Sequence, residues 1–312
     1  MALLIHLTGV NEKAWAEGFR GALPGYPVFL RSDDYDPKAI HYVFAWKPEA
    51  DAFAGMDNLK AILSLGAGVD ALMQHPALPD VPIVRFVDKE LTHCMSDYVI
   101  ANVMMHQRLF TRYAAHQKAK VWNQFYPPAS SETSVGIMGL GTLGLDAAEK
   151  LKVIGFDVCG WSRSKKEVAG VETFAGDGQL DAFLARTDIL VCLLPLTLET
   201  HGILNMDTFK KLRRGLVGGP ALINAARGGH QKEADIATAL EDGTLGAASL
   251  DVFEVEPLPK DSPLWDLKTC FITPHIAAIS NERSGVEYFS QMLKDHEAGQ
   301  PLRNVVDRKR GY

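Results

Sequence analysis

The sequence predicts an α/β protein with parallel sheets and two domains, and three observations support this. The chain has 312 residues, and a typical domain has about 150, so two domains are expected. Short apolar runs alternate with longer segments of helical periodicity, the pattern of strands joined by crossover helices. Hydrophobic residues make up 47% of the chain and charged residues 22%, which is enough apolar material for a large core.

Composition and charge exclude several classes of protein. The net charge is −6, so no basic footprint for nucleic acid is expected. The longest apolar run, Ile189–Leu194, is far shorter than the roughly 18 residues of a membrane span. The first residues lack the basic region of a signal peptide. The four cysteines show no zinc-binding spacing, so we expect no metal and a cytoplasmic protein with reduced thiols.

The first third of the chain alternates between the two kinds of element. The expected strands are Leu3–Leu7, Val28–Arg31, Tyr42–Trp46, Ala61–Leu65 and Ile83–Phe86, and the expected helices include Glu12–Leu23 and Val69–Gln74. A single long helix is then predicted from about Cys94 to Lys120, because apolar residues recur there at helical steps. Such a segment commonly links two domains or covers a partner subunit. Turn-forming residues follow at Pro127–Ser131.

The second half reads as one continuous series of strands and helices. The expected strands are Ser134–Met138, Val158–Trp161, Ile189–Leu194, Ala221–Asn224, Ala247–Val252 and Phe271–Thr273. The expected helices are Leu143–Val153, Gln179–Ala185, Met206–Leu212 and Lys232–Leu240. Six parallel strands with intervening helices are typical of a doubly wound, Rossmann-type dinucleotide-binding domain.

A glycine-rich turn lies between the first strand and the first helix of that series. Gly139, Gly141 and Gly144 form the pattern G-x-G-x-x-G, with Thr142 and Leu143 inside it. Gly139 is expected to make the tight turn, Gly141 to let the backbone approach a pyrophosphate, and Gly144 to let the helix pack closely on the strand. The helix N-terminus supplies free N–H groups and a positive dipole end. The context of strand, turn and helix indicates dinucleotide binding.

The end of the second strand of this series predicts which dinucleotide is bound. An acidic residue is expected there if the cofactor is NAD, because it binds the ribose hydroxyl groups. The sequence instead has Ser162, Arg163 and Lys165, which can hold the 2′-phosphate of NADP through charge-assisted hydrogen bonds. The alternative is a solvated basic loop. We therefore predict NADPH as the preferred cofactor, with weaker use of NAD.

Three candidate catalytic residues follow the last predicted strands. Arg227, Glu256 and His275 all lie where the carboxyl ends of parallel strands place ligands in open α/β sheets. A histidine is the natural proton donor near neutral pH, and a neighbouring carboxylate favours its charged form and selects its tautomer. An arginine can bind a carboxylate or polarise a carbonyl. The three residue types together suit reduction of a 2-oxo acid by hydride transfer.

These segments resemble the D-isomer-specific 2-hydroxyacid dehydrogenase family in order and spacing. The matching pieces are Gly139–Gly144, Leu194–Thr197 with Thr200 and Gly202, Asn224–Gly228, Asp251–Pro257 and Thr273–His275. Within the family, the chain is most similar to the NADPH-preferring glyoxylate/hydroxypyruvate reductase A group, through Trp161–Arg163, His275–Ile279, Leu65–Asp70 and the ending Val306–Tyr312. The resemblance therefore covers nearly the whole chain.

The resemblance implies a role for each candidate residue. His275 donates a proton to the substrate carbonyl oxygen, Glu256 pairs with it, and Arg227 contacts the substrate carboxylate and carbonyl. Further cofactor contacts are implied at Leu194, Pro195, Thr200, Ala225 and Asp251, the last of them to the nicotinamide carboxamide. The backbone N–H groups of Ala67 and Gly68 hold the substrate carboxylate. Trp46 either lines the pocket or packs in the core, and Met95 either lies near the nicotinamide or packs in the core.

The resemblance also implies the domain arrangement and the reaction. Residues 1–97 and 283–312 are expected to form a smaller, flavodoxin-like substrate domain, and 98–282 the NADP-binding domain, with the active site in the cleft. The expected reaction is NADPH-dependent reduction of glyoxylate and hydroxypyruvate to glycolate and D-glycerate by a homodimer. Two alternatives stay open: the same chemistry on a bulkier 2-oxo acid, and a non-catalytic nucleotide sensor similar to the family's corepressor members.

Overall fold

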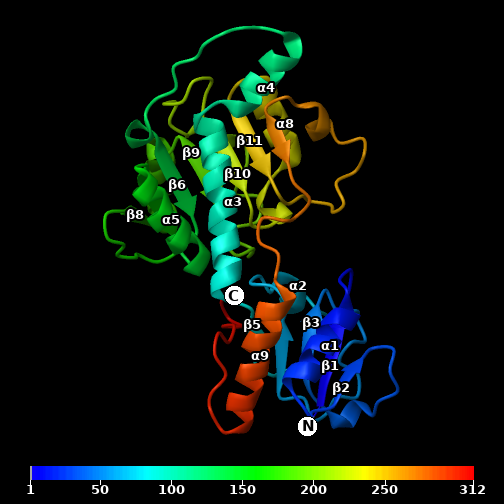
Figure 1. Ribbon diagram of the computed structural model, residues 1–312. Helices are drawn as coiled ribbons and strands as arrows, with labels where there is room; N and C mark the ends of the chain where they lie inside the picture. The colour runs from blue at the N-terminus through cyan, green and yellow to red at the C-terminus, as the bar shows by residue number, and fades with distance from the viewer. Residues whose placement is uncertain (1) are drawn as a thin grey trace. The chain divides into compact units, whose positions relative to one another are not determined.

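The chain divides into two compact units in the computed structural model, which describes residues 2–312 (Figure 1). One unit contains the residues up to Leu91 together with Ser280–Tyr312, and the other contains Thr92–Ile279. Each unit is built on one parallel β-sheet. The predicted α/β fold with two parallel sheets is therefore confirmed, whereas the division into substrate and cofactor domains stays a prediction.

The first unit has a five-stranded sheet within the described residues, in the order β2-β1-β3-β4-β5. This is the 2-1-3-4-5 order of flavodoxin-like sheets, which the resemblance implied. The strands are β1 (Ala2–Leu7), β2 (Val28–Leu30), β3 (Ile40–Trp46), β4 (Ala61–Ser64) and β5 (Ile83–Arg85). The helices are α1 (Glu12–Ala22), the 3-10 turn η1 (Pro37–Ala39), α2 (Asp70–Met73) and α9 (Glu282–Glu297).

Helices α1 and α9 pack against each other on this sheet. Trp15 and Phe19 of α1 and Phe289 of α9 surround Phe44 of β3, with ring centroids 5.0 to 5.2 Å from that ring. An asparagine caps the N-terminus of each helix, Asn11 for α1 and Asn281 for α9. Its side-chain oxygen accepts a hydrogen bond from the backbone N–H three residues on. The buried aromatic cluster thus joins the two ends of the chain in one unit.

The second unit has a seven-stranded sheet among the residues described, in the order β12-β11-β10-β9-β6-β7-β8. Strands β6 to β11, numbered 1 to 6 along the chain, follow the 3-2-1-4-5-6 order of dinucleotide-binding sheets, and β12 is added at the edge beside β11. The strands are β6 (Ser134–Met138), β7 (Asp157–Ser162), β8 (Glu172–Ala175), β9 (Ile189–Cys192), β10 (Ala221–Asn224), β11 (Ala247–Leu250) and β12 (Cys270–Ile272). The strand order changes direction between the neighbouring strands β6 and β9, because the chain adds strands on one side of β6 before it crosses to the other. Ligands are expected at the carboxyl ends of strands at such a switch point.

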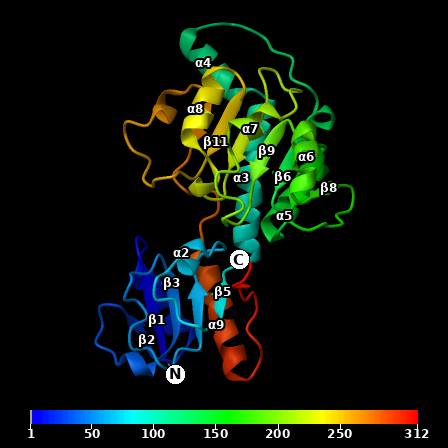
Figure 2. The same cartoon turned by 180° about the vertical axis from the view of Figure 1, so that it is seen from behind.

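Helices cover both faces of this second sheet (Figures 1 and 2). Residues Ile189 and Val191 of β9 pack with α3 and α5, whereas Leu190 and Cys192 pack with α6, α7 and α8. The helices are α3 (Lys89–Gln107), α4 (Phe110–Ala119), α5 (Thr142–Ile154), α6 (Leu180–Arg186), α7 (Met206–Lys210) and α8 (Glu233–Glu241). Four 3-10 turns complete the unit: η2 (Ser130–Glu132), η3 (Asp177–Gln179), η4 (Gly228–His230) and η5 (Pro263–Asp266).

The prediction of one helix from Cys94 to Lys120 was wrong. The region contains two helices instead. Helix α3 begins before the predicted start, at Lys89, and ends at Gln107, and α4 begins at Phe110. Leu109, between them, has the left-handed backbone angles φ 60° and ψ 31°, and its side chain is buried. A leucine rarely adopts this conformation, so the apolar spacing did not indicate the break.

The expectation of six strands in the second sheet was also incomplete. The seventh strand, β8, is a short edge strand that pairs only with β7 among the described strands. Its sequence, Glu-Thr-Phe-Ala, has no apolar run, and its side chains are half-buried or exposed. An edge strand with one partner needs little apolar surface, which is why periodicity did not reveal it.

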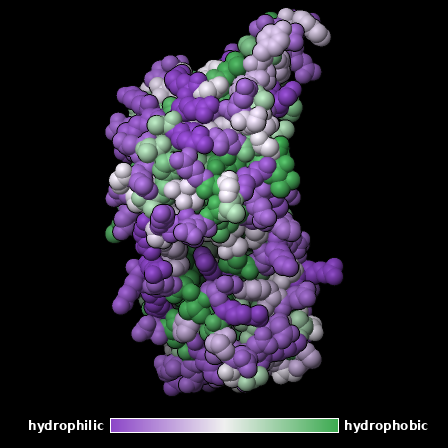
Figure 3. All heavy atoms as spheres, turned by 90° about the vertical axis from the view of Figure 1, so that its left-hand side faces the viewer, coloured by the Kyte–Doolittle hydropathy of each residue, from purple (hydrophilic) through white to green (hydrophobic). Residues whose placement is uncertain are grey.

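The surface is mixed in character. Hydrophilic side chains cover most of the face in Figure 3, with hydrophobic side chains in groups between them. Among residues 2–312, no helix combines the length and the apolar content needed to cross a bilayer. Several large hydrophobic side chains are nevertheless exposed in and after α4, namely Phe110, Val121, Trp122 and Tyr126.

Candidate active site

The glycine-rich turn has the geometry that its three glycines predict. Gly139 has φ 104°, and a Cβ atom there would lie 2.6 Å from the backbone oxygen of Leu193. A Cβ atom at Gly144 would lie 1.9 Å from the oxygen of Gly139, so only glycine lets α5 approach β6 this closely. A Cβ atom at Gly141 would meet nothing within 4 Å. The turn is therefore tightly packed from behind and open at Gly141.

Helix α5 points its N-terminus into that open space. It begins at Thr142, with Leu143 next, and no side chain caps it at Gly141. The uncapped N–H groups and the positive end of the helix dipole favour an anion such as a pyrophosphate. These features fit a dinucleotide, and the individual contacts remain predictions.

The basic segment at the end of β7 lies beside this turn. Ser162 is buried and its hydroxyl donates to the oxygen of Ser164 at 2.8 Å, which shapes the bend. Lys166 reaches back to the turn and donates to the oxygen of Leu140 at 2.7 Å. Lys165 and Lys166 also line an open hollow of about 500 Å³. The sequence predicts a cofactor contact at Lys165 and none at Lys166, whose link to the glycine-rich turn only the structure reveals.

The loop after β9 is held closed by Thr200. Its hydroxyl donates to the oxygen of Pro195 and accepts from the N–H of Thr197, both at 2.8 Å. Leu194 is buried at the base of the loop. The pKa of Glu199, in the same loop, is lowered, chiefly because Thr197 donates to its carboxylate and also because the Arg163 charge lies nearby.

His275 and Glu256 form a hydrogen-bonded pair. The Nδ1 atom of His275 lies 2.9 and 3.1 Å from the two carboxylate oxygens of Glu256. Both side chains are partly exposed, and Glu256 also accepts from the N–H of Phe253 at 3.3 Å. Because Nδ1 faces the carboxylate, Nε2 is the ring nitrogen available to a substrate. The pair has the arrangement of a general acid held in one tautomer by its partner.

Asp251 holds the backbone that carries His275. Its buried carboxylate accepts hydrogen bonds from the Thr273 hydroxyl at 2.6 Å and from the N–H groups of Ile276 and Ala277 at 2.8 and 2.9 Å. The backbone oxygen of Asp251 also accepts a hydrogen bond from the N–H of His275 at 2.8 Å. These bonds stabilise a left-handed His275, with φ 56°, a conformation that costs energy for a non-glycine residue.

A second residue supports this loop from α3. The hydroxyl groups of Tyr98 and Thr273 lie 2.8 Å apart. Burial raises the pKa of Tyr98, so its hydroxyl stays protonated and donates to Thr273, which donates in turn to Asp251. The family resemblance implied Asp251 as a nicotinamide contact, which stays a prediction. The sequence did not indicate the contribution of Tyr98 and Thr273, because hydrogen bonds between elements leave no periodic pattern.

Arg227 follows β10 and belongs to the same unit. Its guanidinium donates to the oxygen of Ala226 at 2.7 Å, and Ala225 before it is buried. Asn224 ends the strand and shapes this turn, because its side chain accepts from the N–H of Ala226 and donates to the oxygen of Arg227, both at 3.1 Å. Arg227, Glu256 and His275 thus all follow the carboxyl ends of neighbouring strands of one sheet.

The predicted substrate contacts Trp46, Ala67 and Gly68 lie in the first unit. Trp46 ends β3, and the other two follow β4. A Cβ atom on Gly66 would lie 2.5 Å from the Trp46 ring, so the indole packs on this glycine, and Lys47 lies 6.0 Å from the ring centroid. Trp46 is therefore half-buried at the edge of the unit and not in its core. Met95, in the second unit, is buried in the apolar cluster that contains Val99 and Val103.

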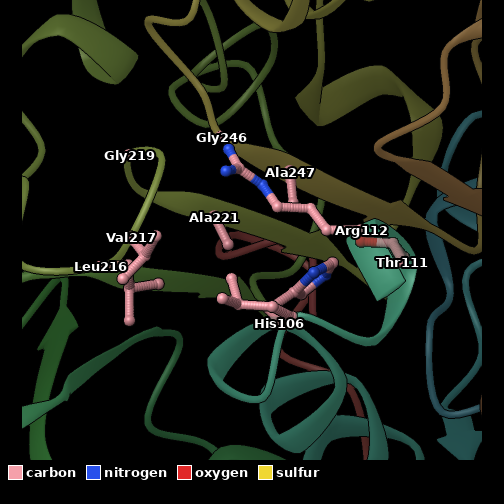
Figure 4. Close-up of a pocket in the computed structure, with 10 residues that line it drawn as sticks. His106, Thr111, Arg112, Leu216, Val217, Gly219, Ala221, Gly246 and Ala247 are labelled. Atoms are coloured by element: carbon pink, nitrogen blue, oxygen red, sulfur yellow. The ribbon is translucent and has the colours of Figure 1, made fainter. Parts of the chain in front are cut away.

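A separate cavity beside His106 is too small for a substrate (Figure 4). It has a volume of about 10 Å³, room for one water molecule, and is lined from α3, α4, β10 and β11. His106 is buried, with Nε2 2.8 Å from the Ser249 hydroxyl, and burial lowers its pKa to about 4. None of the residues that line this cavity is a predicted site residue, so we assign His106 a structural role.

The family relationship follows from comparison with known proteins. Residues 100–277 match the model of the NAD binding domain of D-isomer specific 2-hydroxyacid dehydrogenases, which is more than half of the chain. The chain belongs to the D-isomer specific 2-hydroxyacid dehydrogenase family. The resemblance drawn from the sequence motifs is therefore confirmed.

Full-length relatives narrow this relationship. The glyoxylate/hydroxypyruvate reductase A of Escherichia fergusonii is 40% identical over the whole of both chains. A probable 2-hydroxyacid dehydrogenase from Rhizobium etli, solved with NADP, HEPES and L(+)-tartaric acid, is 47% identical with a TM-score of 0.93. An NADPH-dependent glyoxylate/hydroxypyruvate reductase from Sinorhizobium meliloti, solved with NADP and sulfate, is 44% identical with a TM-score of 0.94. Each structural comparison covers 100% of this chain and 99% of the other.

Proposed function

We propose that this family member is an NADPH-dependent reductase of small 2-oxo acids, with glyoxylate and hydroxypyruvate as substrates. The observation that carries the proposal is the His275–Glu256 pair, at 2.9 Å, on the sheet whose first turn is shaped for a dinucleotide. The relatives at 40% and 44% identity carry that activity in their names, which supports the choice of substrates. The products are then glycolate and D-glycerate.

The residues of the second unit account for cofactor binding and proton transfer. Bound NADPH would supply the hydride that reduces the carbonyl carbon. Gly139, Gly141 and the N-terminus of α5 would hold its pyrophosphate, and Arg163 its 2′-phosphate. Nε2 of His275 donates the proton that the carbonyl oxygen takes up, while Glu256 stabilises the protonated ring.

Arg227 binds the substrate carboxylate and draws electron density from the carbonyl. The product is a 2-hydroxy acid, formed by one hydride at carbon and one proton at oxygen. The reaction needs no metal ion in this scheme, since Arg227 and His275 supply the positive charge.

The proposal is tested by following NADPH absorbance with purified protein and a panel of 2-oxo acids. We expect turnover with glyoxylate and hydroxypyruvate and slower turnover with acids that carry longer side chains. A preference for a long-chain acid would favour the alternative substrate class. Binding of NADPH without turnover of any acid would favour a nucleotide sensor similar to the family's corepressor members.

The cofactor preference gives a separate prediction. Changing Arg163 to alanine should lower kcat/KM for NADPH by about 10-fold or more and leave NADH use nearly unchanged, because only NADPH has the 2′-phosphate. Arg163→Lys should retain part of the preference, since it keeps the charge and loses the paired hydrogen bonds. An equal loss with both cofactors would assign Arg163 a structural role instead.

We also propose a homodimer that pairs through α4 and the segment after it. The Phe125 backbone N–H donates to the Tyr113 hydroxyl, which folds this segment onto α4, yet Trp122 is fully exposed and Phe110 is 59% exposed. Large apolar side chains exposed along one segment of the chain are typical of an interface. The four free cysteines are consistent with a reduced, cytoplasmic setting for this dimer.

Light scattering at micromolar concentration should give twice the 34.2 kDa mass of one chain. Changing both Phe110 and Trp122 to glutamate should yield monomers, because charge is costly at a buried apolar contact. Val153→Glu is the matched control, since Val153 is an exposed apolar residue on a different helix, α5. A monomeric wild-type protein would contradict the proposal.

A further inference from the structure

His230 lies between two loops of the second unit. It ends η4 and is fully buried, with a relative exposure of 0%. Its Nδ1 atom lies 3.1 Å from the backbone oxygen of Arg227, and its Nε2 atom lies 3.2 Å from the backbone oxygen of Pro195. Each ring nitrogen therefore contacts a carbonyl group from a different loop.

The two loops are those that the proposed function assigns to substrate and cofactor. Arg227 carries the guanidinium that binds the substrate carboxylate, and Pro195 belongs to the Leu194–Thr200 loop. Backbone bonds join the same two segments nearby, from the N–H of Gly202 to the oxygen of Gly229 at 2.9 Å and from the N–H of Leu204 to the oxygen of His230 at 2.8 Å. The His230 imidazole therefore adds a side-chain contact to the backbone hydrogen bonds that already join the two segments.

A buried polar network fixes the substrate side of this link. The side chain of Asn224 donates to the backbone oxygen of Arg227 at 3.1 Å and to the side-chain Oε1 of Gln231 at 2.8 Å. The side-chain amide of Gln231 donates in turn to the backbone oxygen of Val252 at 2.9 Å. Asn224 and Gln231 are buried like His230. A satisfied buried network holds its members in one arrangement. The backbone of Arg227 is thus anchored, and His230 connects that anchor to the cofactor loop.

An imidazole suits this position because of where its nitrogens lie. A neutral ring donates from one nitrogen and a protonated ring from both, and each nitrogen here has a carbonyl oxygen to receive the hydrogen. An aliphatic side chain of the same size would fill the space and link neither loop. The contacts therefore indicate a linking role beyond packing.

We propose that His230 is a positioning residue that holds the Arg227 loop and the Leu194–Thr200 loop in register. Its ring nitrogens contact one backbone carbonyl oxygen in each loop, so it is placed to act through them. The inference rests on the proposed function, because the roles of the two loops come from it. Loss of the Nδ1 contact should loosen Arg227, and loss of the Nε2 contact should loosen the cofactor loop.

Two amide substitutions separate the two contacts. The amide nitrogen of asparagine can replace Nδ1 and that of glutamine can replace Nε2, because the two side chains differ by one methylene group. His230→Asn should therefore raise the Kd for NADPH by about 3- to 10-fold, with the KM for glyoxylate within about twofold of wild type, the effect of losing one hydrogen bond. His230→Gln should show the reverse, and His230→Phe should show both losses.

Substitutions at His106 are the matched control. His106 is also a buried histidine of this unit, and its ring bonds to Ser249 away from both loops. His106→Asn and His106→Gln should lower the melting temperature and leave the ratio of NADPH affinity to glyoxylate KM unchanged. A merely structural His230 would behave in the same way as His106.

The outcome that overturns the proposal is an equal change in NADPH Kd and glyoxylate KM in both amide variants, or no change in either. Fluorescence titration of NADPH measures its Kd without turnover. If the wild-type protein reduced no 2-oxo acid, the proposed function would fail, and the difference in NADPH affinity between His230→Asn and His230→Gln would still decide the role of His230.

Discussion

Changing His275 to alanine should lower kcat with glyoxylate by about 10²–10⁴-fold, the usual contribution of general acid catalysis. Negative charge develops on the carbonyl oxygen as the hydride reaches the carbon, and without the imidazole this charge is no longer neutralised by a proton from Nε2. The Kd for NADPH should stay within about twofold of wild type, because the glycine-rich turn and the end of β7 are untouched. Steady-state kinetics and fluorescence titration of NADPH measure the two quantities.

Two further variants test the assignment of His275. Glu256→Gln should keep more activity than His275→Ala, because the amide oxygen of glutamine can still accept from Nδ1 and hold the ring in place. His41→Ala, a histidine of the first unit whose Nδ1 atom contacts the oxygen of Ala39, should behave as wild type. If His275→Ala kept near-normal kcat across the pH range, another acid would have to donate the proton.

The second large effect is expected at Arg227. Arg227→Ala should lower kcat/KM for glyoxylate by about 10²–10⁴-fold, because two charge-assisted hydrogen bonds to a carboxylate, each worth about 1.5–3 kcal/mol, are lost. Both kcat and KM should change. KM should rise because the substrate is bound less tightly in the ground state, and kcat should fall because the guanidinium no longer polarises the carbonyl. Affinity for NADPH should be nearly unchanged.

A charge-conserving variant separates binding from orientation. Arg227→Lys should recover part of the loss in KM and little of the loss in kcat, since an ammonium group lacks the planar pair of donors. Arg214→Ala is the matched control, because the Arg214 guanidinium donates to the oxygens of Gly243 and Thr244 at the surface. An unchanged KM in Arg227→Ala would show that the carboxylate is bound elsewhere.

The parts of the fold that follow from local patterns were predictable. Strands such as β6 and β10 were predicted at their observed bounds, because a buried parallel strand is a short apolar run between turn residues. The glycine-rich turn was predicted with the role of each glycine, and the observed φ of Gly139 and the packing at Gly144 agree with it. The break at Leu109 and strand β8 were missed, because the left-handed conformation and edge pairing leave no mark in periodicity.

The sequence by itself determined the family, the parallel α/β class of the second unit and the residue types that follow its strands, since each depends on residues close together in the chain. Only the tertiary structure decided which groups hold the loops that carry His275 and Arg227. The loop of His275 is held by Asp251 through Thr273 and Tyr98, and the loop of Arg227 is linked to Pro195 through His230. These contacts join residues as far as 175 positions apart, and their hydrogen bonds depend on atomic distances that only the packed fold sets.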